Sequence, residues 1–203
     1  MTSRFFDTAF TASVKAAQEA NGSRNAYARH EGVAEGPDRL TTHEAEFIAA
    51  RDSFYMASVS ETGWPYVQHR GGVAGFVKTL DERTLAFADF RGNRQYVSVG
   101  NISANDRVAL FFMDYPARTR LKLLGRARLV DLENSPDIKR RIVDPSYRAH
   151  VERAFLIDVE AFDWNCPQHI TPRYTMAEIE PMVEGLKARV AELEARLSAL
   201  TAS

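Results

Sequence analysis

Alternating hydrophobic and polar positions predict β-strands through the middle of the chain. Between residues 52 and 164, short apolar runs rich in aromatic and β-branched residues are separated by turn-forming pairs such as Asp81-Glu82 and Asn105-Asp106. Because no long helical pattern separates these runs, they favour an antiparallel barrel over a doubly wound sheet. Strands are expected at residues 54–59, 64–69, 73–80, 84–89, 108–114, 120–132 and 153–162, with the first two forming a hairpin.

Helical patterns flank the predicted strands. An N-terminal run of helix formers ends at Asn21-Gly22, a pair that stops helices. Thr41, with Glu44 three residues later, has the capping-box arrangement and predicts the start of a second helix. Helices are expected at residues 8–19, 41–51 and 95–102, the last as a short crossing between strands.

Apolar residues recur at heptad spacing after Pro181, on one side of a predicted long helix. Their intervals are 4, 3, 4 and 3, and two heptads are shorter than the three or four that secure a coiled-coil assignment. Packing on the parent domain and pairing between subunits therefore both remain open. The residues of this seam are Leu186, Val190, Leu193, Leu197 and Leu200.

These patterns divide the chain into three parts. Residues 1–40 are expected to form an N-terminal helical segment and loop. Residues 41–175 are expected to form the main β domain, and residues 176–203 a C-terminal helix that is a candidate for dimerisation.

Charge is unevenly distributed along the chain. Its formal net charge of −1 gives no global reason to expect nucleic acid or a membrane as partner. Between Trp64 and Arg128, however, eleven Lys and Arg accompany five Asp and Glu, a local balance of +6 that leaves −7 for the remainder. A basic middle is consistent with a focused anion site and also with solvated strand faces.

The protein is expected to be soluble and cytoplasmic. No run approaches the roughly 18–20 apolar residues that a membrane-spanning helix needs. Asp7, Lys15 and Glu19 interrupt the N-terminus where a signal peptide would have its apolar core. The single cysteine, Cys166, excludes an intrachain disulfide and is interpreted as a small buried residue.

Cationic residues gather around the turn at Gly92. Lys78 closes a predicted strand, while Arg91, Asn93 and Arg94 surround Gly92, so that charged side chains and free turn amides can converge on one anion. A phosphate monoester carries nearly two charges and needs several charge-assisted hydrogen bonds. Arg94 also precedes a predicted short helix, whose N-terminal amides favour an anion. This stretch therefore predicts a phosphate site.

A second group of cations follows the predicted strand at residues 120–132. Alternate residues place four basic side chains on one face, which must meet water or an anion. Long basic side chains also cover apolar surface with their stems, so this basic face alone is weak evidence for an anion site. It supports such a site only in combination with the cations near the turn at Gly92. The four residues are Arg120, Lys122, Arg126 and Arg128.

Three segments, taken in their order and spacing, resemble a known family. They are GFVKTLDERTLAFADFRGNRQ at residues 75–95, RLKLLGRARL at 120–129 and FDWNCPQHITPRY at 162–174. The family is the pyridoxamine 5'-phosphate oxidase-like FMN-binding split barrels, in particular a branch of flavin-nucleotide-binding proteins. The resemblance implies a mainly β fold with flanking helices, built as a six-stranded antiparallel split β-barrel of the Greek-key type. It also implies a homodimer that binds two FMN at the subunit interface.

The resemblance also implies roles for individual residues. Lys78, Arg94 and Gln95 are expected to hold the FMN phosphate, and Arg120 to reach the flavin from an adjoining strand. A late tryptophan and a late arginine are expected from the second subunit. The full expected cofactor set is Arg70, Val77, Lys78, Ala88, Asp89, Arg91, Asn93, Arg94, Gln95, Arg120, Trp164 and Arg173.

The chain departs from the oxidase proper at three points. The oxidase has a basic residue where Gln95 stands and an arginine near the position of Val73, a role for which Arg70 is the candidate here. The substrate element that follows the late tryptophan is missing, because Pro167-Gln168-His169-Ile170 does not match it. Oxidation of pyridoxine phosphate is therefore not expected.

Three classes of function remain open. An FMN-dependent oxidoreductase with a small-molecule substrate is favoured, and in it the flavin itself performs the electron chemistry. A flavin-binding carrier or sensor without turnover is the main alternative, and a nucleic-acid-binding basic barrel is the least favoured. The absence of a GxGxxG strand-turn-helix unit argues against a nicotinamide-binding Rossmann domain.

Catalytic residues and the exact ligand are less defined. His69 and His169 are weak candidates for acid–base catalysis because the pKa of histidine lies near neutrality. No metal site is expected, because no histidine pair has metal-ligand spacing. The physiological substrate, the electron donor and acceptor, and whether haem or a deazaflavin replaces FMN are left open by the sequence.

Overall fold

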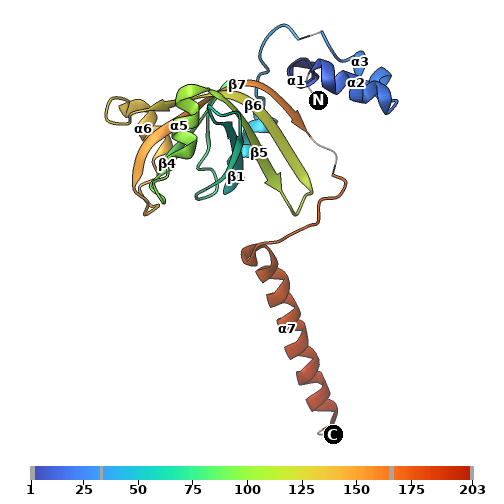
Figure 1. The fold of residues 1–203 in the computed structure, drawn as a ribbon. Coiled ribbons are helices and arrows are strands. Elements are labelled where there is room, and N and C mark those ends of the chain that lie inside the picture. The colour runs from blue at the N-terminus through green and yellow to red at the C-terminus, as the bar shows by residue number, and fades with distance from the viewer. Residues whose placement is uncertain (1–2, 33, 165–166, 202–203) are drawn as a thin grey trace. The chain divides into compact units, whose positions relative to one another are not determined.

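Seven antiparallel strands form one sheet in the computed structural model, which describes residues 3–32, 34–164 and 167–201 (Figure 1). The strand order is β2-β1-β5-β6-β7-β4-β3, with the long strands β6 and β7 in the middle. The strands are β1 (Ser53–Val59), β2 (Pro65–Gly71), β3 (Lys78–Asp81), β4 (Thr84–Phe90), β5 (Arg107–Asp114), β6 (Thr119–Val130) and β7 (Val151–Trp164). The expected mainly β, antiparallel class is confirmed.

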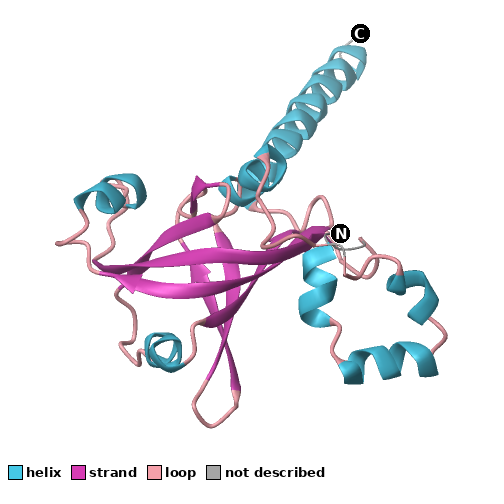
Figure 2. Cartoon of the chain, turned by 90° about the horizontal axis from the view of Figure 1, so that it is seen from above, coloured by secondary structure: helices cyan, strands magenta, loops and turns pink. Residues whose placement is uncertain are grey.

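Helices that precede or connect the strands lie beside the sheet (Figure 2). The expected hairpin of β1 and β2 and the short helix before β5 are both present. The helices are α1 (Ser3–Ala9), α2 (Ala12–Ala20), α3 (Arg24–Ala28), α4 (Thr42–Ala49), α5 (Val97–Ala104), α6 (Pro136–Ile142) and α7 (Met176–Thr201).

The expectation of a six-stranded barrel is wrong. The sheet has seven strands, and within the described residues no ladder joins its two end strands, β2 and β3. The strand expected at residues 73–80 begins only at Lys78, because Gly75 has a φ of +78° and Phe76 and Val77 are buried in the core. A four-residue β3 pairs with β4 alone, so the sheet stays open.

Some helix boundaries differ from the predicted ones because an N-terminal cap was not recognised in the sequence. The helix expected at residues 8–19 is two helices, because Thr11 caps α2 by accepting a hydrogen bond from the backbone N–H of Val14. The last helix begins at Met176, at the start of the predicted C-terminal part and before the apolar seam, because Thr175 and Glu178 form a reciprocal cap in which each side chain accepts from the other's backbone N–H. Neither α3 nor α6 was expected.

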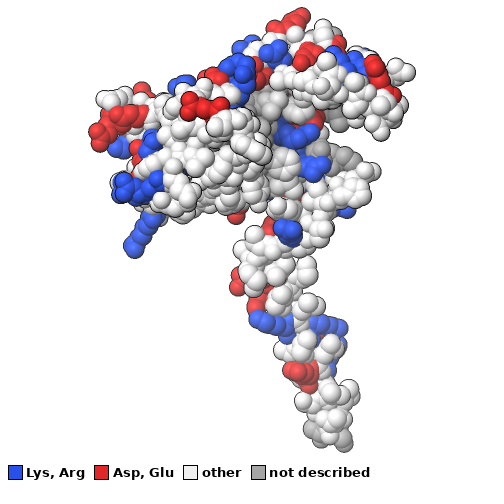
Figure 3. Space-filling view, viewed as in Figure 1, with Lys and Arg blue, Asp and Glu red and all other residues white. Residues whose placement is uncertain are grey.

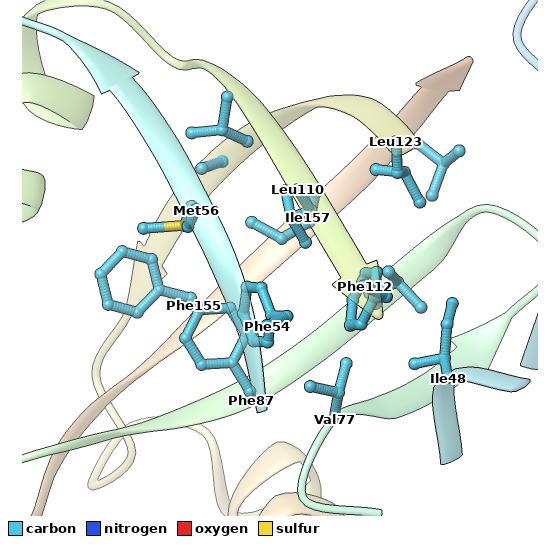
Figure 4. Close-up of a cluster of buried hydrophobic side chains, with 14 of the residues drawn as sticks. Ile48, Phe54, Met56, Val77, Phe87, Leu110, Phe112, Leu123, Phe155 and Ile157 are labelled. Carbon is cyan, nitrogen blue, oxygen red and sulfur yellow. The ribbon is translucent and has the colours of Figure 1, made fainter. Parts of the chain in front are cut away.

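The main hydrophobic core lies on one face of the sheet (Figure 4). Phe54 stacks on Phe112 with ring centroids 4.9 Å apart, and Phe87 stacks on Phe155 at 5.0 Å. Ile48 of α4 is fully buried against the same cluster. Each such side chain contributes roughly 1.5–3 kcal/mol when buried, so this cluster fixes how β1, β4, β5 and β7 pack.

A smaller cluster covers the opposite face of β4. Leu85 and Phe87 belong to the main core, whereas the alternate residues Ala86 and Ala88 pack with Leu132, Ile142 and Leu156. Period-2 alternation therefore gives β4 two buried faces. This arrangement fixes which face each residue of the neighbouring β3 shares.

Two compact units make up the chain. One contains residues 1–114 and 119–167, and the other contains residues 115–118 and 168–203, including α7. None of the described helices has the length and apolar character needed to cross a membrane. Cys166, interpreted above as buried, lies outside the described residues.

Candidate anion-binding site

A pocket at the end of β4 brings together five of the expected cofactor residues. It has a volume of about 200 Å³ and is formed by β2, the end of β4, the loop at residues 91–96, the start of α5 and one residue of β7. Gln68, Tyr96, Ser98 and Glu152 are also in its wall. The five expected residues are Arg70, Asp89, Asn93, Arg94 and Gln95.

Both carboxylates of the pocket are already paired with arginines. Arg70 Nη1 lies 2.7 Å from Asp89 Oδ1, and Arg153 Nε lies 3.4 Å from Asp89 Oδ2. Arg91 Nε donates to Glu152 Oε1 at 2.9 Å, and Arg153 Nη2 donates to Glu152 Oε2 at 3.1 Å. Hydrogen bonding from Arg91 is the largest cause that lowers the pKa of Glu152. The negative charges of Asp89 and Glu152 are therefore balanced by neighbouring arginines.

Arg94 is the cation of this cluster that has no carboxylate partner. Its Nε donates to Tyr96 Oη at 3.4 Å, and among the described residues it forms no ion pair. The cluster has four arginines and two carboxylates, which leaves an excess of two positive charges. Its members are Arg70, Arg91, Arg94 and Arg153 with Asp89 and Glu152. The site is therefore prepared for an anion rather than neutralised by the protein itself.

Burial makes the Arg70–Asp89 pair the structural centre of the pocket. The two side chains are 12% and 8% exposed, and the guanidinium carbon of Arg70 lies 4.8 Å from the centroid of the Phe155 ring. Burial raises the pKa of Asp89, although Arg70 and Arg153 partly oppose this effect. A buried carboxyl group with a raised pKa inside a pocket is a physical marker of a functional site.

The backbone of the loop at residues 91–96 is strained at two positions. Arg94 has a φ of +61° and Tyr96 a φ of +54°, in the left-handed region that residues other than glycine avoid. Such positions cost about 1–3 kcal/mol each and concentrate at binding sites. The loop is held by Arg91 N, which donates to His150 O at 2.8 Å, and by Gln95 N, which donates to the side chain of Asn93 at 3.1 Å. This strain makes the loop a candidate for ligand binding.

Lys78 and Val77 do not line this pocket. Val77 is buried, and both residues border a separate hollow of about 550 Å³ that Arg141 and Thr79 also line. In the register of the sheet Lys78 stands opposite Ala86, so its side chain shares the face of Ala86 and not that of Asp89. Within one chain, Lys78 and Asp89 therefore lie on opposite faces of the sheet.

Ala88 and His69 line a third hollow of about 150 Å³. It shares Gln68, Arg70 and Phe90 with the anion pocket, so the two hollows adjoin. The His69 ring packs edge-on to Tyr55, with centroids 5.6 Å apart. His69 therefore borders the adjoining hollow from the sheet face that it shares with Tyr55, opposite the face of Arg70, and its acid–base role stays a prediction.

Arg120 lies on β6, opposite Met113 of β5. Its guanidinium carbon is 5.8 Å from the centroid of the Phe111 ring, and its buried Nε has no hydrogen-bond partner among the described residues. It is not among the residues that line the anion pocket. Its contact with the flavin stays a prediction.

Trp164 is held by α4 of its own chain. Its Nε1 donates to Glu44 Oε1 at 2.8 Å, and its ring packs edge-on against Phe47 with centroids 4.7 Å apart. The other carboxylate oxygen of Glu44 accepts from the backbone N–H of Thr41 at 2.9 Å, which completes the predicted capping box. Glu44 therefore joins the start of α4 to the end of β7.

Removal of the Glu44 carboxylate is expected to destabilise this junction. Burial acts to raise the pKa of Glu44, but hydrogen bonds from Thr41 and Trp164 outweigh it and lower the pKa overall. The ionised form therefore contributes stability above the unfolded pKa of about 4.5, and this contribution is lost as the pH falls through the folded pKa. We expect Glu44→Ala to lower the free energy of unfolding by about 2–3 kcal/mol at pH 7.

Denaturant unfolding between pH 3 and 7 measures this effect. The difference between wild type and Glu44→Gln should shrink below about pH 4.5, because only the wild type loses a charge there. The control is Glu46→Gln, a change at an exposed position of the same helix. A pH-independent difference for Glu44→Gln would contradict the assigned role.

His169 and Arg173 belong to the second unit. His169 has a φ of +61°, and the guanidinium carbon of Arg173 lies 5.0 Å from the centroid of the Tyr115 ring in the same unit. Their proposed contacts with the flavin and with substrate stay predictions. Among the described residues no group of three or more His, Cys, Asp or Glu side chains is placed to hold a metal ion.

Sequence reasoning missed Glu152 and Arg153. Glu152 lines the pocket and Arg153 contacts both of its carboxylates, because Asp89 stands opposite Arg153 in the β4–β7 ladder. The sequence separates them by more than 60 residues and gives no pairing register. Tyr96 was also missed, although it directly follows Gln95, and its position beside the cation-rich turn was an available signal.

A model of the pyridoxamine 5'-phosphate oxidase family matches residues 40–162, more than half of the chain. The chain belongs to this family. The match spans β1 to β6, β7 as far as Phe162 and the whole loop at residues 91–96. No curated protein matches this pyridoxamine 5'-phosphate oxidase family member.

Solved structures similar to this family member share little sequence with it. HupZ from Group A Streptococcus is 16% identical, with a TM-score of 0.47 over 66% of this chain and 100% of that one. A Clostridium acetobutylicum protein related to general stress protein 26 is 16% identical, with a TM-score of 0.42 over 68% and 94%. An FMN-binding protein from Syntrophomonas wolfei is 12% identical, with a TM-score of 0.42 over 59% and 81%. Structural similarity at these sequence identities and TM-scores carries no information on the ligand or activity of this chain.

Proposed function

We propose that this protein binds flavin mononucleotide at the anion pocket and uses it to transfer electrons to or from a small molecule. One observation carries the proposal: two excess positive charges surround a strained loop in a chain of the pyridoxamine 5'-phosphate oxidase family. In Figure 3 basic and acidic side chains are intermixed over the visible surface and do not form one broad basic face. This distribution favours a local anion site over an extended one.

The residues present fit the phosphate end of FMN. A phosphate monoester carries about −1.5 to −2 charges at neutral pH, which matches the excess of the arginine cluster. Arg94 has no carboxylate partner among the described residues, and the amides of the loop offer further donors. The pocket of about 200 Å³ is smaller than the roughly 300–1,000 Å³ of a complete ligand site, so the flavin ring needs additional surface.

A second copy of the chain is proposed to supply that surface. Lys78, Arg120 and Trp164 do not line the pocket of one chain, and the family resemblance assigns Trp164 and Arg173 to the second subunit. A homodimer with two FMN molecules at its interface would supply the surface that the pocket of one chain lacks. It would also bring Trp164 and Arg173 of the partner subunit to the flavin. Dimerisation is then part of the function.

Bound FMN would supply an electron-accepting ring, while the protein holds and orients it. Arg94 would bind the phosphate, Arg70 would line the pocket beside it while paired with Asp89, and no side chain need act as a covalent catalyst. His69 lines the adjoining hollow and is the candidate for moving a proton near the ring. The alternative of a carrier or sensor uses the same pocket without turnover.

Titration with FMN followed by reduction separates these possibilities. Quenching of flavin fluorescence should reveal one FMN per chain, and NADH or NADPH should reduce the bound flavin, which oxygen then reoxidises over many cycles. Binding without turnover would indicate a carrier or sensor. Protein that ignores FMN but binds haem or a deazaflavin would contradict the cofactor assignment.

A further inference from the structure

We propose that α7 pairs with α7 of a second copy of this chain as a parallel, two-stranded coiled coil. No residue of α7 is buried, and its apolar side chains are widely exposed, with Val183 at 41% and Leu200 at 76%. In Figure 3 uncharged surface runs along this helix between its charged side chains. An apolar stripe of this length marks an interaction surface.

The apolar seam is longer in the structure than in the sequence pattern. Because α7 begins at Met176, Ile179 and Val183 continue the spacing of 4 and 3 toward the N-terminus. The seam then covers three heptads, the length at which a coiled-coil assignment becomes secure. Pro181 and Gly185 occupy outward-facing heptad positions and do not interrupt it. The seam residues are Ile179, Val183, Leu186, Val190, Leu193, Leu197 and Leu200.

The identity of the seam residues favours two strands. In heptad notation the a positions are Val183, Val190 and Leu197, so two of the three are β-branched valine. Three of the four d positions are leucine, the fourth being Ile179. β-branched residues at a with leucine at d favour parallel dimers over trimers or tetramers.

The flanking charges favour the parallel orientation. A parallel pair places Arg189, at a g position, beside Glu194 of the partner subunit at an e position, and symmetry repeats this attraction. In the antiparallel register that overlaps the whole seam, repulsion between Arg189 and Arg196 of the partner subunit offsets the attraction of Lys187 to Glu194 of the partner subunit. Within one chain Arg189 and Arg196 both pair with Glu192, whereas Glu194 forms no ion pair among the described residues. Glu194 is therefore available to the partner.

The charge of α7 argues against a membrane surface as the occupant of the seam. The helix carries five acidic and three basic residues. Helices that lie on anionic membranes carry an excess of Lys and Arg on their polar face. A second copy of the same helix satisfies both the apolar seam and the charges beside it.

Disulfide cross-linking of the full chain tests the pairing. Cys166 is first changed to Ser, and Leu193→Cys or Ala195→Cys is then introduced. Leu200→Cys in the same background tests the direction of the pairing, because the two copies of residue 200 meet only in a parallel pair. A parallel dimer places the two copies of residue 193 together at a core position, whereas residue 195 faces outward. We expect Leu193→Cys to form an intermolecular disulfide at least about tenfold faster than Ala195→Cys in dilute apoprotein, because pairing raises the local concentration of the two thiols.

A charge exchange supplies an independent check. Glu194→Arg should slow cross-linking of Leu193→Cys, and the additional change Arg189→Glu should restore it. Equal rates for Leu193→Cys and Ala195→Cys, with α7 still helical by circular dichroism, would overturn the proposal and indicate that α7 covers its own chain. Dimerisation through the sheet alone would give the same equal rates. Because the test uses apoprotein, a failure of FMN binding leaves its result unaffected.

Discussion

Arg70→Met should lower the free energy of unfolding by about 3–5 kcal/mol, the usual cost of leaving a buried charge without its partner. Methionine keeps the apolar contact with Phe155 but removes the guanidinium that lies 2.7 Å from Asp89. Arg153 remains 3.4 Å from the other carboxylate oxygen and cannot replace the shorter contact. Asp89, which is 8% exposed and whose pKa burial already raises, must then either stay charged in a poorly solvated site or take up a proton, and both cost free energy at pH 7.

Chemical and thermal unfolding of the apoprotein measure this effect. The melting temperature should fall by about 10 °C, given the size of the chain. The double variant Arg70→Met with Asp89→Leu should recover most of the loss, because no buried charge then remains. The matched control is Arg128→Ala: Arg128 and Asp158 are both 53% exposed and 3.5 Å apart, and such pairs contribute less than about 1 kcal/mol. Equal losses from the two single arginine variants would contradict the assigned role of Arg70.

The sequence was informative wherever the signal is local. The strand runs, the hairpin of β1 and β2 and the capping box of Thr41 and Glu44 each depend on neighbouring residues, and the structure contains all three. The gathering of Arg91, Asn93 and Arg94 is also local, and the strained loop keeps these residues together.

Long-range register was beyond the reach of the sequence. Placing Arg153 beside Asp89 requires the β4–β7 ladder, and placing Lys78 on the face of Ala86 requires the β3–β4 register. A shift of one residue would move Lys78 to the other face. Closure of the sheet also depends on pairing between β2 and β3, which the turn at Gly75 prevents by shortening β3.

The second large effect concerns the ligand rather than the fold. Arg94→Ala should weaken FMN binding by about 10- to 100-fold, because a hydrogen bond to a charged group contributes about 1.5–3 kcal/mol. Arg94 is exposed, and within the described part of the chain its side chain donates only to Tyr96, so the melting temperature of the apoprotein should remain close to that of the wild type. Arg128→Ala serves again as the control, since Arg128 does not line the pocket.

The affinity ratio of FMN to riboflavin tests the central claim most directly, because the two ligands differ only in the phosphate. Fluorescence titration of the wild type should show FMN bound at least about 100-fold more tightly than riboflavin, since several charge-assisted contacts go to the phosphate. Arg94→Ala should lower that ratio by weakening FMN alone, with riboflavin affinity unchanged. Equal affinities of the wild type for FMN and riboflavin would contradict a phosphate site in the arginine cluster beside β4.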